Sequence, residues 1–160
     1  MTPSSRLTPE ALALARSGVD RVTDRREDAA WLEAAWTDLR TRVLVIDEGR
    51  ARVSAGPDGV RLVLVPPASA PAGPRYLLGE DDDGVVHFAV PGALSPDGTA
   101  PDGTAPDGVT TDSASRDGVR LDDLRGVGAL LGDRDAGLLV HAVALDAWHR
   151  AHPRCPRCGA

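Results

Sequence analysis

The sequence predicts an α+β fold in which helices pack against an antiparallel sheet. Three observations predict it. Apolar residues recur at helical spacing near both ends, short strand-like stretches fill residues 42–90, and turns rich in Gly and Asp separate those stretches. A chain of 160 residues is long enough for one domain and too short for two. Because only 3% of the residues are aromatic, we expect a modest core.

The first ninety residues predict one helix on an antiparallel sheet. The helix is expected over 27–39, with Asp28 as its N-cap and with Leu32 and Leu39 on its apolar stripe. The strands that follow are expected at 42–46 and 51–53, joined by a turn at 47–49, at 60–65, and at 75–78 and 85–90 around the turn at 81–84. Connections this short predict hairpins.

Two further helices are predicted after residue 119, over 121–131 and 135–149. The second is the clearer one, because Leu138, Ala142 and Leu145 lie on one helical face. We expect Asp133 or Asp135 to cap this helix and Pro153 to end it. Trp148 is expected to anchor the helix in the core, and His149 and His152 are expected on the surface or at the helix end.

A low-complexity insert separates the two regions. The run Pro-Asp-Gly-Thr-Ala occurs at 96–100, recurs unchanged at 101–105, and begins again at 106–108. It offers a turn-forming residue at nearly every step and little to bury, so we expect a disordered or loosely turned surface segment. Its period of five does not fit the nonapeptide repeat of calcium-binding solenoids.

Charge and hydropathy exclude several classes of protein. The formal net charge is -6, and all 18 basic residues are arginine, which we interpret as a genomic bias. That charge argues against unspecific coating of nucleic acid or of an acidic membrane. The longest apolar run, 136–145, is about half of the roughly 20 residues that a membrane span needs. We therefore expect a soluble cytoplasmic protein with no membrane partner.

The only two cysteines stand near the C-terminus as Cys155-Pro-Arg-Cys158, followed by Gly159. This spacing is typical of a zinc knuckle, in which both thiolates bind one metal ion. A thioredoxin-like redox pair would open a helix, whereas this pair follows one. Structural zinc needs four ligands. The remaining two could come from His149 and His152, at the expense of tetrahedral geometry, or from a second chain.

The C-terminal segment resembles the bacterial NADH pyrophosphatases of the Nudix superfamily. In these proteins a helix ending in Trp-His, as at Trp148-His149, leads into Cys-Pro-x-Cys-Gly, as at 155–159. Weaker matches lie at 14–21, 25–26, 31–32 and 75–79. The resemblance covers the chain apart from the insert.

The resemblance implies an N-terminal domain related to a degenerate Nudix fold, then a four-cysteine zinc ribbon, then a catalytic Nudix domain. It implies hydrolysis of the NAD(H) pyrophosphate to nicotinamide mononucleotide and AMP, and removal of NAD caps from RNA. Relatives are similar in being dimers that use magnesium or manganese. Carried over to this sequence, Cys155 and Cys158 match the first two zinc ligands, and no residue matches the other two.

The Glu-rich box that would hold catalytic metal ions in this family, Gly-x5-Glu-x7-Arg-Glu-x2-Glu-Glu-x-Gly, does not occur in the sequence. Clustered carboxylates are needed to hold such ions for phosphate chemistry. The acidic runs 81–83 and 122–123 are interpreted instead as a solvated hairpin tip and a helix start. We therefore expect no catalytic residues and no magnesium or manganese site in this chain.

The resulting prediction is the non-catalytic N-terminal region of an NADH pyrophosphatase, truncated within the zinc ribbon and inactive alone. The expected division is a Nudix-like α+β domain at 1–91, the insert at 92–118, a helical part of the same domain at 119–152, and half of a zinc knuckle at 153–160. The alternative is a stand-alone module without enzymatic activity, in which two chains share one zinc ion through their cysteine pairs.

Overall fold

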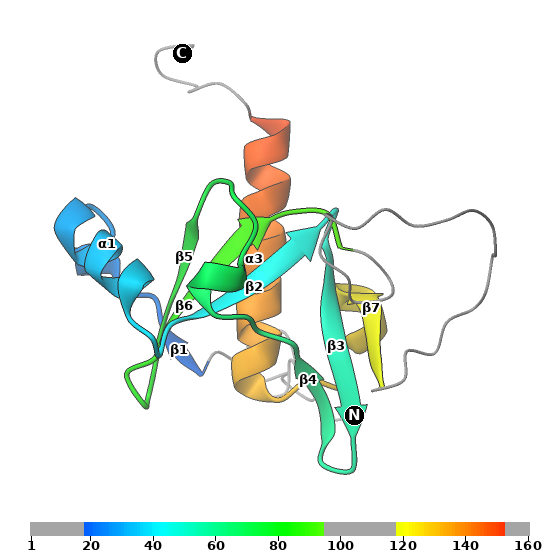
Figure 1. Ribbon diagram of the computed structural model, residues 1–160. Coiled ribbons are helices and arrows are strands. Elements are labelled where there is room, and N and C mark those ends of the chain that lie inside the picture. The colour runs from blue at the N-terminus through cyan, green and yellow to red at the C-terminus, as the bar shows by residue number, and fades with distance from the viewer. Residues whose placement is uncertain (1–17, 95–117, 153–160) are drawn as a thin grey trace, which may run out of the picture.

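The computed structural model describes residues 18–94 and 118–152, and these residues build one seven-stranded sheet with helices (Figure 1). The strands are β1 (Val19–Asp20), β2 (Arg42–Asp47), β3 (Arg50–Gly56), β4 (Gly59–Leu62), β5 (Tyr76–Asp81), β6 (Val86–Pro91) and β7 (Val119–Asp123). The helices are α1 (Ala29–Thr37), α2 (Leu124–Val127) and α3 (Asp133–Ala151), with 3-10 turns η2 (Thr23–Arg25) and η3 (Pro67–Ser69). The predicted α+β class is confirmed.

The sheet is mixed rather than wholly antiparallel. Its strand order is β1-β5-β6-β2-β3-β4, and β7 pairs with β3 off this path. The pairs β2/β3, β3/β4, β5/β6 and β3/β7 are antiparallel, but β2 and β6 run parallel from Arg42↔His87 to Ile46↔Pro91. Sequence-local hairpins could be predicted from their turns, whereas this parallel pair joins strands about forty residues apart and has no turn to reveal it.

Helices cover both faces of the sheet. Neighbouring residues of one strand point to opposite faces. Thus Leu44 packs into the core cluster that contains Leu138 and Leu139 of α3, and Val43 packs into a second cluster that contains Ala35 of α1. In Figure 1, the long helix α3 lies behind the sheet, and α1 lies to one side of β5.

The first helix and the first hairpin form as predicted. Asp28 caps α1, because its Oδ1 accepts a hydrogen bond from the backbone N–H of Trp31 at 3.0 Å. The β2–β3 turn holds Glu48 and Gly49 at positive φ, 49° and 80°, as tight hairpin turns require.

The region 121–131, predicted as helix, is instead the strand β7 followed by the short helix α2. Strand β7 forms five residue pairs with β3, from Ser54↔Val119 to Arg50↔Asp123. Asp123 ends the strand and caps α2, accepting a hydrogen bond from the Gly126 N–H at 2.8 Å. The expectation that the Asp122–Asp123 run begins a helix is therefore confirmed for Asp123, but the helix is one turn long.

The long helix α3 is confirmed, but two predictions about its ends are wrong. Its N-cap is Gly132, with no side-chain cap. Asp135 is buried and accepts a hydrogen bond from the Leu62 N–H at 2.8 Å, so it ties α3 to β4 instead of capping the helix. Trp148 is 49% exposed and is not a core anchor, because it lies near the end of α3 beyond the buried residues.

Replacing Asp135 by alanine is expected to lower the free energy of unfolding by about 1–3 kcal/mol, because the buried Leu62 N–H would lose its acceptor. Urea unfolding of the purified chain measures this. The matched variant Asp135→Asn keeps an acceptor oxygen at the same position and is expected to retain more of the stability. Equal losses in both variants would contradict the role given to this hydrogen bond.

No helix among residues 18–94 and 118–152 combines the length and the apolar character needed to cross a membrane.

Candidate functional site

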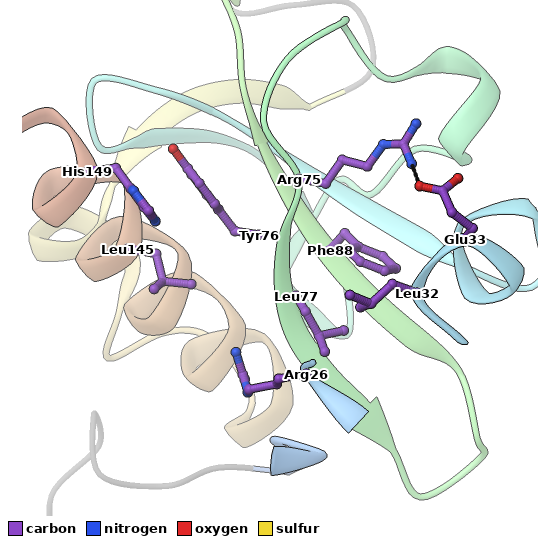
Figure 2. Close-up of a pocket in the computed structure, with 9 residues that line it drawn as sticks. All are labelled: Arg26, Leu32, Glu33, Arg75, Tyr76, Leu77, Phe88, Leu145 and His149. Atoms are coloured by element: carbon purple, nitrogen blue, oxygen red, sulfur yellow. Dashed lines mark hydrogen bonds and ion pairs between the residues drawn. The ribbon is translucent and has the colours of Figure 1, made fainter. Parts of the chain in front are cut away.

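A groove lies between α1 and α3 at the edge of β5, with a volume of about 360 Å³ (Figure 2). Strand β5 lines its middle, α1 forms one wall and α3 forms the other, so the groove runs between the two helices across the edge of the sheet. The residues that line it are Arg26, Leu32, Glu33, Arg75, Tyr76, Leu77, Phe88, Leu145 and His149.

The groove exists because β1 covers only one end of β5. Strand β1 pairs with Glu80 and Asp81 and with no earlier residue of β5. The chain then turns away at Val22, which has a positive φ of 42° and whose N–H donates to Asp20 Oδ1 at 2.9 Å. Over Tyr76 and Leu77, the described residues provide no strand on this side of β5.

On the α1 wall, Arg75 is held by two contacts. Its Nη1 donates to Glu33 Oε1 at 2.9 Å, and its guanidinium lies 4.2 Å from the ring centre of Trp36. Trp36 in turn packs edge-on against Phe88, with ring centres 5.3 Å apart. These contacts fix a cation at the rim of an aromatic surface.

On the α3 wall, four rings form a continuous series, which we name the aromatic ladder: Tyr76, His149, Trp148 and His152. Tyr76 stacks on His149 with centres 4.7 Å apart and planes only 2° from parallel. The series continues through Trp148, 4.8 Å from His149 and 5.3 Å from His152. Burial and the charge of Asp146 raise the pKa of Tyr76, so its hydroxyl is neutral at physiological pH. The ladder leads from the groove to the end of α3.

His141 lies half-buried beside the open part of β5. Its Nδ1 is 3.2 Å from the carbonyl oxygen of Leu78. Burial, and then the positive charges of Arg21 and Arg26, lower the pKa of His141 below its ordinary value. Burial, with Arg21 beside it, also lowers the pKa of Arg26, which nevertheless stays charged. This end of the groove therefore carries positive charge.

The lowered pKa of His141 makes stability depend on pH in a defined direction. Below about pH 6.5, the unfolded chain binds a proton that folded His141 resists, so stability falls as the pH drops from about 7.5 to about 5.5. Urea unfolding at the two pH values should show a smaller loss in His141→Gln than in the parent chain. An unchanged loss would show that His141 is not responsible.

The residues predicted from sequence as site or surface residues fall in different places. His149 and His152 are exposed at the end of α3, as expected. The run 81–83 is a solvated hairpin tip only in part. Asp82 and Asp83 are exposed, but Asp81 is half-buried, with its side chain 7% exposed and its Oδ2 3.0 Å from His87 Nε2. This pairing was missed because it joins residues on two strands and no local pattern shows it.

The predicted zinc ligands Cys155 and Cys158 lie outside the described residues. Within residues 18–94 and 118–152, no three His, Cys, Asp or Glu side chains come together as a metal site would need. Of the residues that line the groove, Glu33 alone is acidic, and Arg75 neutralises it. The groove is thus suited to contact aromatic, apolar or anionic groups rather than to hold a metal ion by carboxylates.

The residues that line the groove were not predicted as a site. Arg75 and Tyr76 belong to a predicted strand, and Leu32 to a predicted apolar stripe, so each looks structural by itself. Only the packing of α1 and α3 on either side of β5 brings them together. The one available signal was the Arg75–Gly79 match to the family.

The fold and groove define an α+β domain whose described residues present an aromatic and cationic surface. A comparison with protein-family models identifies the family: residues 40–148 match the NADH pyrophosphatase-like rudimentary NUDIX domain. The match runs from just before β2 nearly to the end of α3, and the chain belongs to this family. A search of curated proteins found no match to the chain.

Proposed function

We propose that this chain acts as the non-catalytic NUDIX-like region of an NADH pyrophosphatase, an enzyme that splits NAD(H) into nicotinamide mononucleotide and AMP and removes NAD caps from RNA. The observation that carries the proposal is the family match over residues 40–148. The lack of a Glu-rich box in the sequence and the uncharged or cationic lining of most of the groove support a binding role.

The proposed contribution of this region is contact between subunits and framing of the substrate pocket. The aromatic ladder supports this role, because Trp148, between His149 and His152 in it, leaves 49% of its surface exposed. Large aromatic side chains contribute strongly when a partner buries them. We take that partner to be a second copy of the chain in a homodimer.

An assay for NADH cleavage by the purified chain, with magnesium or manganese added, tests the first part of the proposal. The expected result is background hydrolysis, because no carboxylate cluster in the sequence matches the family's metal-binding box. Turnover that survives removal of contaminating enzymes would refute it.

Sequencing the DNA that follows the codon for Ala160 gives a second test. A further Cys-x-x-Cys and a Glu-rich box there would support the proposal that the chain is part of an NADH pyrophosphatase.

Replacing Trp148 by alanine is expected to weaken self-association by about tenfold or more, since hot-spot aromatic residues are worth about 2 kcal/mol or more. Sedimentation over a range of concentrations measures the dimer. The control is Leu39→Ala, which removes another exposed apolar side chain that is not part of the aromatic ladder. A monomeric parent chain, or equal effects of the two variants, would contradict the proposed interface.

The second candidate function is a zinc-sharing dimer module without a catalytic partner. The pair Cys155 and Cys158 favours it, because two thiolates satisfy half of zinc's four positions and a second chain supplies the rest. Zinc-dependent dimers with one zinc ion per two chains, lost in Cys158→Ser, would support this module. One zinc ion per monomer would instead favour a local site with His149 and His152.

A further inference from the structure

The edge of β5 is open along the groove between α1 and α3. Strand β1 pairs with β5 only at Glu80 and Asp81, so among the described residues Tyr76 and Leu77 have no neighbouring strand on that side. Their other neighbour is β6, with which both residues pair in antiparallel register. The groove follows this open stretch, and residues of α1 and α3 form its two walls (Figure 2).

The open edge leaves backbone groups without hydrogen-bond partners. In an antiparallel pair, consecutive residues alternate between bonding to the partner strand and pointing their N–H and C=O the other way. Tyr76 and Leu77 are consecutive and both pair with β6, so one of the two directs its N–H and its C=O toward the groove. Among the described residues, no hydrogen bond satisfies that pair of groups. Such an edge is a template for an added strand.

A strained residue turns the chain away from this edge. Strand β1 pairs Asp20 with Glu80 antiparallel to β5, so its continuation would run along Leu77 and Tyr76. Instead Val22, buried and β-branched, takes a positive φ of 42°, a conformation that is costly for such a side chain. Strain of this kind persists only where the surrounding structure holds it, and it clusters at functional sites. Its effect here is to leave the edge of β5 open.

The walls of the groove are apolar on both sides of the open edge. Leu32 of α1 and Phe88 of β6 line one side, and Leu145 of α3 lines the other. Successive side chains of an added strand point to opposite faces of the sheet. Apolar side chains of that strand would therefore contact one wall or the other.

One end of the groove carries a cation without a counter-charge. Arg26 is half-buried, its Nε donates to the carbonyl oxygen of Arg21 at 3.1 Å, and it makes no ion pair with the described residues. Burial and the charge of Arg21 lower the pKa of Arg26, and Arg26 stays charged. Glu33, the only acidic residue that lines the groove, is already paired with Arg75 at 2.9 Å. The charge of Arg26 is thus available to a bound carboxylate.

We propose that an extended acidic peptide of a partner protein binds along the open edge of β5 as an added strand, with a carboxylate on Arg26. Each part of the groove selects one property of this partner. The unpaired backbone groups require an extended chain, the two walls favour apolar side chains, and Arg26 favours an acidic one. The inference does not depend on the proposed function, because its test involves neither NADH cleavage nor zinc.

Two segments of this chain fit the groove less well than a partner does. In residues 1–17, the side chains of Arg6, Arg16 and Glu10 sum to a charge of +1 (2 − 1), so this segment is not acidic. The insert is acidic, but its repeat at 96–108 places a proline at every fifth position. Proline cannot donate to the hydrogen bonds of a strand pair.

The test measures amide exchange by NMR on the full 160-residue chain, with the acetylated and amidated peptide Glu-Val-Thr-Val-Glu as the probe. In the free chain, one of the Tyr76 and Leu77 amides should exchange quickly and the other slowly. Saturating peptide should slow the fast amide by about tenfold or more, because its N–H then donates to the added strand. Calorimetric titration should show one peptide bound per chain.

The contribution of charge is tested with a neutral peptide and with two arginine variants. The probe Gln-Val-Thr-Val-Gln should bind about tenfold more weakly than the acidic one, as for loss of one charge-assisted hydrogen bond. Arg26→Gln should weaken binding of the acidic peptide to a similar extent and remove the difference between the two peptides. The matched control is Arg125→Gln, which removes an exposed arginine of α2 that does not line the groove. Thermal melting confirms that both variants are folded.

Several results would overturn the proposal. Protection of both amides in the free chain at every concentration would show that a segment of this chain already fills the edge. Protection that rises with chain concentration would show that a second copy fills it. Absence of saturable peptide binding, equal affinity for the acidic and neutral peptides, or equal weakening in Arg26→Gln and Arg125→Gln would also contradict it.

Discussion

Replacing Leu139 by alanine is expected to lower the free energy of unfolding by about 2–5 kcal/mol. Leu139 lies in the middle of α3, is fully buried, and packs in the cluster that contains Leu44 and Leu78 of the sheet. Its truncation removes apolar contacts and leaves a cavity between the helix and the sheet. Chemical denaturation, followed by the tryptophan fluorescence or by far-ultraviolet circular dichroism, measures the change.

The matched control for this substitution is Leu39→Ala. The same side-chain atoms are removed there from a residue that is 91% exposed, so the expected change is within about 0.5 kcal/mol. If both variants lose similar stability, the packing of α3 on the sheet does not contribute most of the core's stability.

Replacing Gly79 by alanine is expected to lower stability by roughly 3 kcal/mol or more. Gly79 has a positive φ of 146°, which L side chains rarely adopt, and such backbone strain alone is worth about 1–3 kcal/mol. An added Cβ would also collide with the carbonyl oxygen of Asp20. The collision and the register shift between Leu77 and Gly79 lie where β1 meets β5, so we expect β1 to separate from the sheet.

Hydrogen exchange can locate this damage. Amides of β1 and of its partners Glu80 and Asp81 should exchange faster in Gly79→Ala than in the parent chain, with smaller changes in β3 and β4. Gly56→Ala is the control, because Gly56 does not have a positive φ and a Cβ there would meet no atom within 4 Å. A loss in the control as large as in the test variant would rule out the steric explanation.

The elements that could be predicted from sequence are those with local signals. The helix α1 begins at a capping aspartate, and the β2–β3 hairpin has a glycine at its turn. The strand β7 was missed because Leu121, Leu124, Val127 and Leu131 stand at helical spacing, and pairing with β3 overrides that preference. The residue pattern of 119–123 gives no sign that this segment pairs with β3, some seventy residues earlier in the sequence.

The candidate sites show the same division. The exposed positions of His149 and His152 followed from their place at a helix end, whereas the stacking of His149 on Tyr76 depends on how α3 lies against β5. The contact of Asp81 with the buried His87 depends on the β5–β6 pairing. An aspartate in a run of three is normally solvated, and only the tertiary structure reverses that expectation for Asp81.

The placement of α3 over the main core has a consequence for synthesis on the ribosome. Leu44, Ala51 and Leu78 are made early, but the helix that shields them is the last described element of the chain. Until residues 133–151 have left the exit tunnel, that apolar surface faces water and the nascent chain is open to misassociation. Slow translation between β6 and α3 would lengthen this vulnerable interval, and chaperones that bind nascent chains would protect it.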